Sequence, residues 1–405
     1  MSTTPVKPAA MAGHPIDRRR AACGMLASVA GLAVPMGARA AGPVKIGFVG
    51  PLSGPLARVG ETNRNCLLLA VNEINAAGGL LGQKIEVIAE DSQMSSKVTL
   101  DKARKLVMND SVAMLTGMVL PMEREAALQA VAGTDRLVVF PNFDEGRCHP
   151  QLLTTGLASN QRVEPLVEWV VSNVGKTMYI IASDFGTTRY TLIPQVTAAL
   201  QRHGGRLMGV RFFPFGTRDF APTLQQVQSL GPELVWHSIG DDPITFVKQY
   251  HSFGMKPQLV TDITHESLAL ATEGASAGNI GVSPYFMSVA GDANKRFLDG
   301  YTRQFADSTP LRIGSHVVML PHGESTYVGA KLFAAAAKAA GSVDGAKVKA
   351  ALAGVTLAAP RGEVRVAPGG GHLLCQSLIA RAKPDSSFAL LSAMGPVAPQ
   401  CAAAT

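Results

Sequence analysis

The sequence lacks the features that mark several large classes of protein. Beyond its first 40 residues, no apolar stretch approaches the ~18 residues that a helix needs to cross a bilayer. No run of basic residues is interleaved with aromatic ones, so no nucleic-acid partner is expected. There is no C-x-x-C pair and no cluster of histidine with cysteine, so neither a metal site nor a cofactor is expected.

Motifs of nucleotide-dependent enzymes are also missing. No Walker phosphate loop is present, and no G-x-G-x-x-G opens the first strand–helix unit. The glycines at 369–371 are better explained by a turn. Serines, aspartates and histidines are present, but no pattern arranges them as nucleophile, base and orienting group. We therefore expect a binding protein, with a hydrolase as the less favoured alternative.

The first 40 residues have the pattern of an export signal. Three arginines at 18–20 precede an apolar stretch that is as long as the core of a secretory signal and short for a membrane span. The segment 38–40 reads Ala-Arg-Ala, so we expect residues 1–40 to be removed after Ala40, by the Sec or the twin-arginine route. The removed part carries five basic residues and one acidic residue, so the charge falls from +7 to +7 − 4 = +3. Export places the chain in the periplasm.

Four cysteines remain after this cleavage, at positions 66, 148, 375 and 401. Export to an oxidising compartment makes a disulfide reasonable. Both Cys375 and Cys401 lie in the C-terminal segment, which favours a bond between them, with Cys66 and Cys148 free or paired with each other.

From residue 43 onwards, short apolar runs alternate with longer amphipathic stretches. Two such series of similar size predict an α/β fold of two doubly wound lobes, each with a parallel sheet. Ligands of such sheets bind outside the carboxyl ends of the strands, so the cleft between the lobes is the expected site. In the first series we expect strands at 44–49, 84–89, 113–116 and 137–140 and helices at 61–79, 98–109 and 123–133. In the second we expect helices at 163–174, 190–203, 220–229 and 244–253 and strands at 177–182, 206–213, 234–237 and 258–261.

Several segments resemble type I periplasmic binding proteins, and more narrowly the leucine/isoleucine/valine-binding family of ABC-transporter receptors. They are VKIGFVGPLSGPLARVG with the following AVNEINAAGGLLGQKIEVIAED, then TRDFAPTLQQVQSLGPELVWHSIGDDPITFVKQYHSFGM, and near the end APRGEVRV. The resemblance covers nearly all of the mature chain. It implies a monomer that closes two lobes around a small-molecule ligand and presents the closed form to a membrane permease.

A finer match lies in FPNFDEGRCHPQLLTTGLASNQ, which is similar to the amide-sensing and urea-binding branch of that family. Members of that branch usually have tyrosine where this chain has Asp144. Because a carboxylate replaces a neutral aromatic side chain here, urea or a simple aliphatic amide is not the expected ligand.

The resemblance also implies a hinge of three strands, because the chain of such proteins passes between the lobes more than once. We place the crossings near 157–160, 282–286 and 360–364. The first lobe would then hold residues 42–158 and 285–360, and the second 159–284 and 361–400.

In the first lobe, candidate ligand contacts follow three of the strands. Ser53 and Gly54 offer a hydroxyl and open N–H groups before a helix, which suit a carboxylate or carbonyl oxygen, although an ordinary turn explains them equally well. The loop that contains Val119 is apolar where amino-acid receptors of the family place serine or threonine, so only its backbone is expected to bind. This speaks against a standard branched-chain amino acid. After the fourth strand, the expected contacts are Phe143, Asp144 and Glu145.

In the second lobe, Phe185 and Gly186 match the position where an aromatic residue of the family stacks on the ligand. Asp241 and Asp242 precede a helix, where they are either cleft residues or an ordinary N-cap. These acidic candidates fit a small polar solute that is cationic or carries an amide. Lower-ranked contacts are His265, Glu266 and Glu324.

Two further hypotheses remain open. A sensor module for a regulator or chemoreceptor would use the same binding physics, and genes for permeases and ATPases beside this one would favour uptake. His316 and His322 flank a loop with Glu324, but their spacing matches no helix face, so no metal is expected.

Overall fold

The computed structural model describes residues 1–5, 42–369 and 371–401, so the expected cleavage site after Ala40 lies outside the described residues. The chain divides into two units, Met1–Gly42 and Pro43–Thr405, and both large sheets belong to the second. None of the described helices combines the length and the hydropathy that crossing a bilayer requires.

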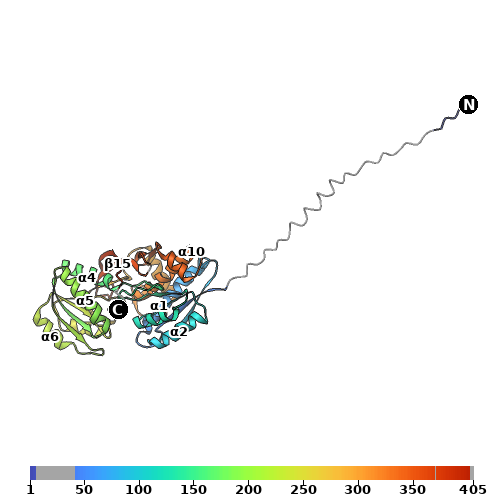
Figure 1. Ribbon diagram of the computed structural model, residues 1–405. Coiled ribbons are helices and arrows are strands. Elements are labelled where there is room, and N and C mark those ends of the chain that lie inside the picture. Colours follow the sequence, from blue (N-terminus) through green and yellow to red (C-terminus); the bar gives the residue numbers. More distant parts are fainter. Residues whose placement is uncertain (6–41, 370, 402–405) are drawn as a thin grey trace. The chain divides into compact units, whose positions relative to one another are not determined.

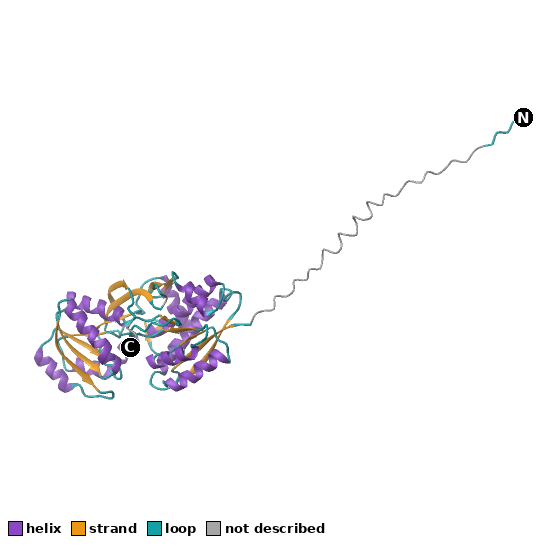
Figure 2. Cartoon of the chain, in the orientation of Figure 1, coloured by secondary structure: helices purple, strands orange, loops and turns teal. Residues whose placement is uncertain are grey.

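The first sheet has five parallel strands in the order β2-β1-β3-β4-β5. The strands are β1 (Val44–Gly50), β2 (Ile85–Asp91), β3 (Met114–Thr116), β4 (Leu137–Phe140) and β5 (Leu152–Thr154). The helices between the first four are α1 (Ala57–Ala76), α2 (Ser96–Met108) and α3 (Pro121–Val131). Every residue of β4 is buried, as expected for a parallel strand with helices on both faces of its sheet (Figure 2). We call this sheet, with the helices packed on it, the first lobe.

The second sheet has nine strands and is mixed. Its parallel part holds β6 (Thr177–Ser183), β7 (Arg206–Phe213), β8 (Leu234–Ser238), β9 (Gln258–Thr261) and β10 (Ile280–Ser283). Antiparallel strands continue it, namely β15 (Leu373–Ala382), β16 (Phe388–Val397), β14 (Gly362–Val366) and β13 (Thr356–Ala359). Its helices are α4 (Ser159–Asn173), α5 (Ile193–Arg202), α6 (Ala221–Leu230) and α7 (Pro243–Ser252). We call the parallel strands β6–β10 with α4–α7 the second lobe (Figure 1).

After β10 the chain returns to the first lobe. There α9 (Asp292–Gln304) and α10 (Pro321–Ala340) pack against α1, and α11 (Gly345–Leu352) packs against α10 and β4. A small hairpin of β11 (Arg312–Ile313) and β12 (His316–Val317) joins α9 to α10, and the short α8 (Glu266–Ala271) lies between β9 and β10. The two doubly wound sheets confirm the expected fold class, whereas the residue bounds given above for the two lobes stay a prediction.

The helix expected at 190–203 begins differently. Its first turn is π-helical, η1 (Thr188–Leu192), and α5 starts only at Ile193. Pro194 has no N–H to donate to the carbonyl of Tyr190, so the regular ladder cannot run through this point. The N–H of Ile193 instead bonds to the carbonyl of Thr188, five residues back.

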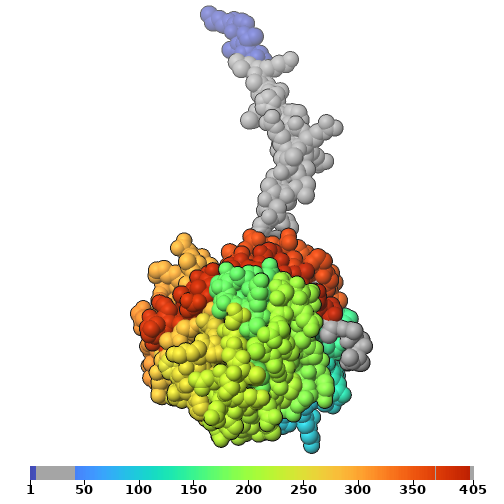
Figure 3. Space-filling model, turned by 90° about the vertical axis from the view of Figure 1, so that its left-hand side faces the viewer, coloured from blue at the N-terminus to red at the C-terminus, as the bar shows by residue number. Residues whose placement is uncertain are grey.

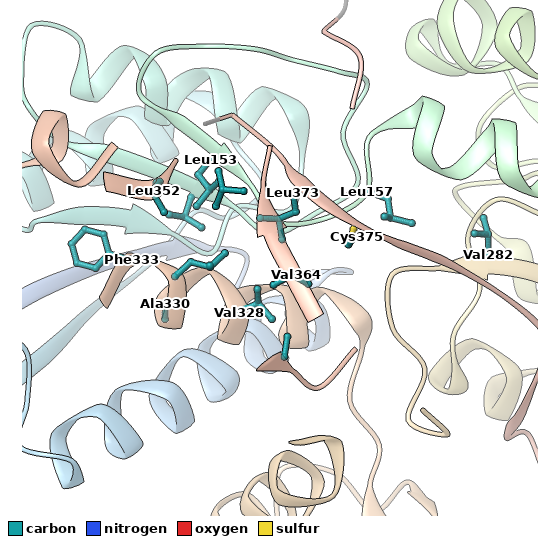
Figure 4. Close-up of a cluster of buried hydrophobic side chains, with 14 of the residues drawn as sticks. Leu153, Leu157, Val282, Val328, Ala330, Phe333, Leu352, Val364, Leu373 and Cys375 are labelled. Atoms are coloured by element: carbon teal, nitrogen blue, oxygen red, sulfur yellow. The ribbon is translucent and has the colours of Figure 1, made fainter. Parts of the chain in front are cut away.

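One apolar cluster runs through both lobes and the segments that join them. It includes Phe48 of β1 and Trp236 of β8, both fully buried. Figure 4 shows Leu157, Val282 and Val364, which lie at the expected crossings, in this same cluster. The connection between the lobes is therefore a packed core rather than a loose linker.

Polar contacts of α4 also stabilise this connection. Gln161 donates two hydrogen bonds of 2.8 Å, to the carbonyls of Leu373 in β15 and Val397 in β16. Pro165 cannot donate to the Gln161 carbonyl, and that carbonyl instead accepts a bond of 2.5 Å from the Ser377 hydroxyl. The C-terminal strands thus lie beside α4, as the red and green segments of Figure 3 show.

The expected disulfide is wrong. The bond joins Cys148 to Cys401, whereas Cys66 and Cys375 are free and buried. Cys375 faces the apolar core from β15 and pairs in register with Val397 of β16. Cys401 lies four residues beyond Val397, where the chain has left β16 and reached the loop that follows β4.

A buried ion pair fixes the third expected crossing. The side chain of Arg361 is 2% exposed and that of Glu324, in α10, is fully buried. The Arg361 Nε donates to Glu324 Oε2 at 2.8 Å, Nη1 to the Thr155 carbonyl at 3.0 Å, and Nη2 to the Ser325 hydroxyl at 2.6 Å. One guanidinium thus links the turn between β13 and β14 to α10 and to the end of β5.

We predict that Arg361→Ala lowers the free energy of unfolding by about 3–5 kcal/mol, because it leaves the Glu324 carboxylate buried and unpaired. Urea denaturation followed by circular dichroism measures this. Arg365→Ala, at an exposed position on β14, is the matched control and should change stability by less than about 0.5 kcal/mol. Equal losses in the two variants would contradict the anchoring role of Arg361.

Candidate functional site

The ends of four parallel strands meet around one cavity of about 160 Å³. Pro121 follows β3, Phe143–Glu145 follow β4, Thr187 follows β6, and Asp262 with Ile263 follows β9. The first two groups belong to the first lobe and the other two to the second. The cavity therefore lies between the carboxyl ends of strands from both lobes, which is where open α/β sheets bind ligands.

Three of the ten candidate contacts line this cavity, namely Phe143, Asp144 and Glu145. The other seven do not. Ser53 and Gly54 are exposed after β1, Val119 is buried, Phe185 and Gly186 are exposed after β6, and Asp241 and Asp242 follow β8. All seven still lie just beyond the carboxyl ends of parallel strands, in the loops that carry the site in this architecture.

Asp144 is occupied by protein partners. Its side chain is fully buried, and Oδ2 accepts from Arg124 Nη1 at 2.7 Å. Its Oδ1 accepts from the N–H groups of Gly146 and Arg147, both at 2.6 Å, and lies 3.2 Å from His372 Nε2. Burial alone would raise the pKa of Asp144, but the hydrogen bond from His372 and the charge of Arg124 hold that pKa below its usual value. The charged Asp144 is therefore an anchor for the loop after β4.

The remaining acidic candidates are also engaged. Glu145 pairs with Arg124 at 2.7 Å. Asp241 accepts from the Ser183 hydroxyl at 2.8 Å and from the Gly216 N–H at 2.6 Å. Asp242 caps α7 through the Thr245 N–H and forms an ion pair with Arg218. Whether any of these carboxylates also contacts a ligand stays a prediction.

Several donors, by contrast, have no partner among the described protein atoms. The Nε and Nη2 atoms of Arg58, the Nε of Arg162 and the Nδ1 of His322 are buried and make no hydrogen bond. Arg162 lines the cavity and is only 6% exposed. Its Nη1 pairs with Asp262 Oδ2 at 2.5 Å, which leaves Nε free for a further acceptor.

These donors belong to one row of side chains. The Arg162 guanidinium lies 4.8 Å from the centre of the Phe143 ring, and the rings of Phe143 and His322 form a T-shaped pair with centroids 5.3 Å apart. The ring centroids of His322 and His265 lie 6.3 Å apart, and the nearby charge of Arg58 lowers the pKa of His265. We call Arg58, His265, His322, Phe143 and Arg162 the arginine–histidine row.

Both histidines of the row are neutral at neutral pH. Burial, with a smaller contribution from Arg58, lowers the pKa of His265 to about 4. Burial and the neighbouring His265 lower the pKa of His322 to about 3. The Nδ1 of His265 accepts a 3.2 Å hydrogen bond from the Leu268 N–H, so the ring proton of the neutral form sits on Nε2. The row thus offers uncharged imidazoles beside two guanidinium groups.

Of this row, the sequence points to Phe143 as a contact and to His265 at lower rank. His322 is considered only as a metal ligand, and Arg58 and Arg162 are not among the candidate contacts. The signal that identifies Arg58, Arg162 and His322 is a buried nitrogen without a hydrogen-bond partner, and it depends on which distant residues come close in the fold.

Residues 274–278 read Gly-Ala-Ser-Ala-Gly, which fits the G-x-S-x-G pattern of hydrolase nucleophiles. In hydrolases that serine stands at a sharp turn from a strand into a helix. Here Ser276 follows the helix α8 and precedes the strand β10, is 8% exposed, and has its hydroxyl 2.7 Å from that of Thr272. The setting does not suit a nucleophile. Within the described residues, no group of three or more histidine, cysteine, aspartate or glutamate side chains could hold a metal ion.

We predict that Asp144→Asn destabilises the ligand-free protein by about 2–3 kcal/mol at neutral pH, because a charged hydrogen-bonding partner of buried Arg124 is lost. The folded-state pKa is depressed, so this stabilisation exists above the unfolded value of 3.8 and is lost as the pH falls through the folded value. The difference from the native protein should therefore shrink as the pH falls below 3.8. Glu145→Gln, on a side chain 26% exposed, is the control with a smaller loss. An unchanged stability in Asp144→Asn would contradict the anchoring role.

Comparisons with known proteins agree with this geometry. Residues 43–387 match the family described as periplasmic binding protein. The chain is 25% identical over 354 residues to Leu/Ile/Val-binding protein homolog 7 of Brucella melitensis biotype 1, covering 80% of this chain and 84% of that protein.

Two solved structures share the fold. A solute-binding protein of an ABC transporter from Rhodopseudomonas palustris BisB5, in complex with 3,4-dihydroxy benzoic acid, superposes with a TM-score of 0.77 at 20% identity, over 88% of this chain and 98% of that one. The branched-chain amino acid transporter substrate-binding protein of Streptococcus pneumoniae, in complex with isoleucine, gives a TM-score of 0.74 at 18% identity, over 87% and 99%. Two lobes with a cavity between their strand ends, and a family match over residues 43–387, lead to one conclusion. The chain belongs to the periplasmic binding protein family, whose members are exported to bind small solutes.

Proposed function

We propose that this protein captures a small solute in the cavity between its lobes and delivers it to the membrane permease of an ABC transporter. The observation that carries the proposal is the lining of the cavity. Residues that follow β3 and β4 of the first lobe face residues that follow β6 and β9 of the second. A solute bound there contacts both lobes at once, so its binding favours the form in which they are closest.

Exposed aromatic residues at the strand ends of the second lobe support this mechanism. Phe185 follows β6 and is 49% exposed, and Phe215 follows β7 and is 57% exposed. Their ring centroids lie 5.7 Å apart. Large apolar side chains gain free energy when they are removed from water, so closure over a solute would bury this pair favourably.

The proposal also covers export and oligomeric state. The chain would lose residues 1–40 on export, act as a monomer in the periplasm, and perform no chemical reaction on its solute. The relatives named for Leu/Ile/Val binding and the structures of transporter components support uptake as the role. A sensing role would differ only in the partner that recognises the closed form.

The direct test is a thermal-shift screen of the purified mature protein against amino acids, amides, ureas, polyamines and organic acids. Capture of a solute predicts a rise in the melting temperature with one group of related compounds. Mass spectrometry of the recovered compound should find it unchanged. Hydrolysis or other turnover of the compound by the pure protein would contradict a binding role.

We predict that Phe185→Ala weakens the affinity for the best compound of that screen about tenfold or more, because the loss of a buried phenyl contact costs at least 1.4 kcal/mol. The melting temperature of the ligand-free variant should stay close to that of the native protein. Phe253→Ala, at the exposed end of α7, is the control and should leave the affinity unchanged. Isothermal titration calorimetry measures both, and equal affinities in the two variants would exclude Phe185 from the site.

A further inference from the structure

We infer that the solute is an organic anion whose carboxylate binds to Arg58, and that an ammonium group has no place in the site. This deepens the proposed function and rests on it. The inference differs from what the sequence favours, a cationic or amide-bearing solute, and it follows from which polar groups of the site have partners and which do not.

The first step is the acidic side chains. A cationic solute needs a carboxylate that is free to receive it. Asp144 holds Arg124 and two backbone N–H groups, Asp241 holds Ser183 and Gly216, and Asp262 holds Arg162 together with the Ser238 hydroxyl at 2.8 Å. The three carboxylates that line the cavity, Asp144, Glu145 and Asp262, each already form an ion pair with an arginine, and Asp241 does not line it, so an ammonium group finds no unpaired carboxylate there.

The second step is Arg58. No described acidic side chain forms an ion pair with it, and its Nε and Nη2 atoms are buried without a hydrogen-bond partner. These two nitrogens form one edge of the guanidinium plane, so their N–H groups point the same way. That edge matches the two oxygens of a carboxylate, which it binds through two parallel hydrogen bonds. Buried donors of this kind are costly unless an acceptor is supplied, and the solute can supply it.

The third step is the position of Arg58 in the fold. It is the second residue of α1 and follows β1, the strand that lies between β2 and β3 in the first sheet. The loop before it contains Gly54, which is exposed and can add a backbone hydrogen bond to the same anion, whereas the hydroxyl and N–H of Ser53 already bond to Asp91. Arg58 thus lies at the carboxyl end of a strand inside the sheet, in the region where this architecture binds solutes.

The fourth step is the rest of the row. Because His265 accepts the Leu268 N–H at Nδ1, its Nε2 is a further donor. His322 and Phe143 present ring surfaces at 75° to each other and carry no charge at neutral pH. A solute with a carboxylate at one end and an apolar body at the other fits this combination. The chemical class is therefore a small aromatic or branched aliphatic carboxylic acid.

The test compares compounds that differ only in their polar group. One set is benzoate, benzamide and benzylamine, and the other is isocaproate, isocaproamide, isohexylamine and leucine. Leucine is isocaproate with an added ammonium group. We expect benzoate, isocaproate or both to bind, as measured by thermal shift and calorimetry. Each carboxylate that binds should do so at least tenfold more tightly than its amide and amine, and isocaproate at least as tightly as leucine.

The matched variants are Arg58→Gln and, as control, Arg104→Gln at an exposed position of α2. Arg58→Gln should weaken carboxylate binding at least thirtyfold and remove the preference over the amide. Its ligand-free melting temperature should be unchanged or higher, because the lost guanidinium had no partner. Arg104→Gln should bind as the native protein does.

The possible outcomes separate this inference from the proposed function. Binding of an amine, an amide or a polyamine in preference to every carboxylate would overturn the inference and leave solute capture standing. Carboxylate binding that survives Arg58→Gln would overturn the role of Arg58. If no compound of these sets or of the wider screen binds, the inference and the proposed function both fail.

Discussion

All the strands of a parallel sheet end on the same edge, and this constraint determines where the functional groups of the protein lie. Backbone groups at that edge leave the hydrogen-bond ladder and become available to side chains and ligands. The chain builds one such sheet and the parallel part of a second, mixed one, and it brings the loops after β3, β4, β6 and β9 around one cavity. The site therefore consists of loops that follow strands of two sheets, and a solute that contacts loops of both sheets links the two lobes.

The connection between the two lobes is packed and hydrogen-bonded. A single apolar cluster runs from Phe48 to Trp236, and Gln161 and Arg361 add buried hydrogen bonds at the crossings. The disulfide from Cys148 to Cys401 fastens the C-terminal segment to the loop that carries Asp144. These contacts lie where the two lobes are joined, whereas Phe185 and Phe215 at the strand ends remain exposed. The lobes are thus joined through a packed core, and apolar surface remains exposed at the strand ends.

The sequence predicted the alternation of strands and helices well, because apolar runs and turn residues are local signals. The strands at 137–140, 206–213 and 258–261 match β4, β7 and β9 at both ends. Local signals do not say which side chains will pair. Asp144 looked like a free cleft carboxylate, yet its partners Arg124 and His372 lie 20 and 228 residues away in the sequence. For the same reason, the sequence does not reveal that one edge of the Arg58 guanidinium has no partner, and it favours Cys375 over Cys148 as the partner of Cys401.

The most direct test of this account is a crystal structure of the mature protein with a bound carboxylate, grown with benzoate or isocaproate. The account predicts density for the solute between the lobes, with both carboxylate oxygens within hydrogen-bond distance of the Arg58 guanidinium and residues after β6 or β9 touching the same molecule. Two results would contradict the account. The first is a solute that contacts one lobe alone. The second is a solute whose carboxylate lies away from Arg58 and for which Asp144 leaves Arg124.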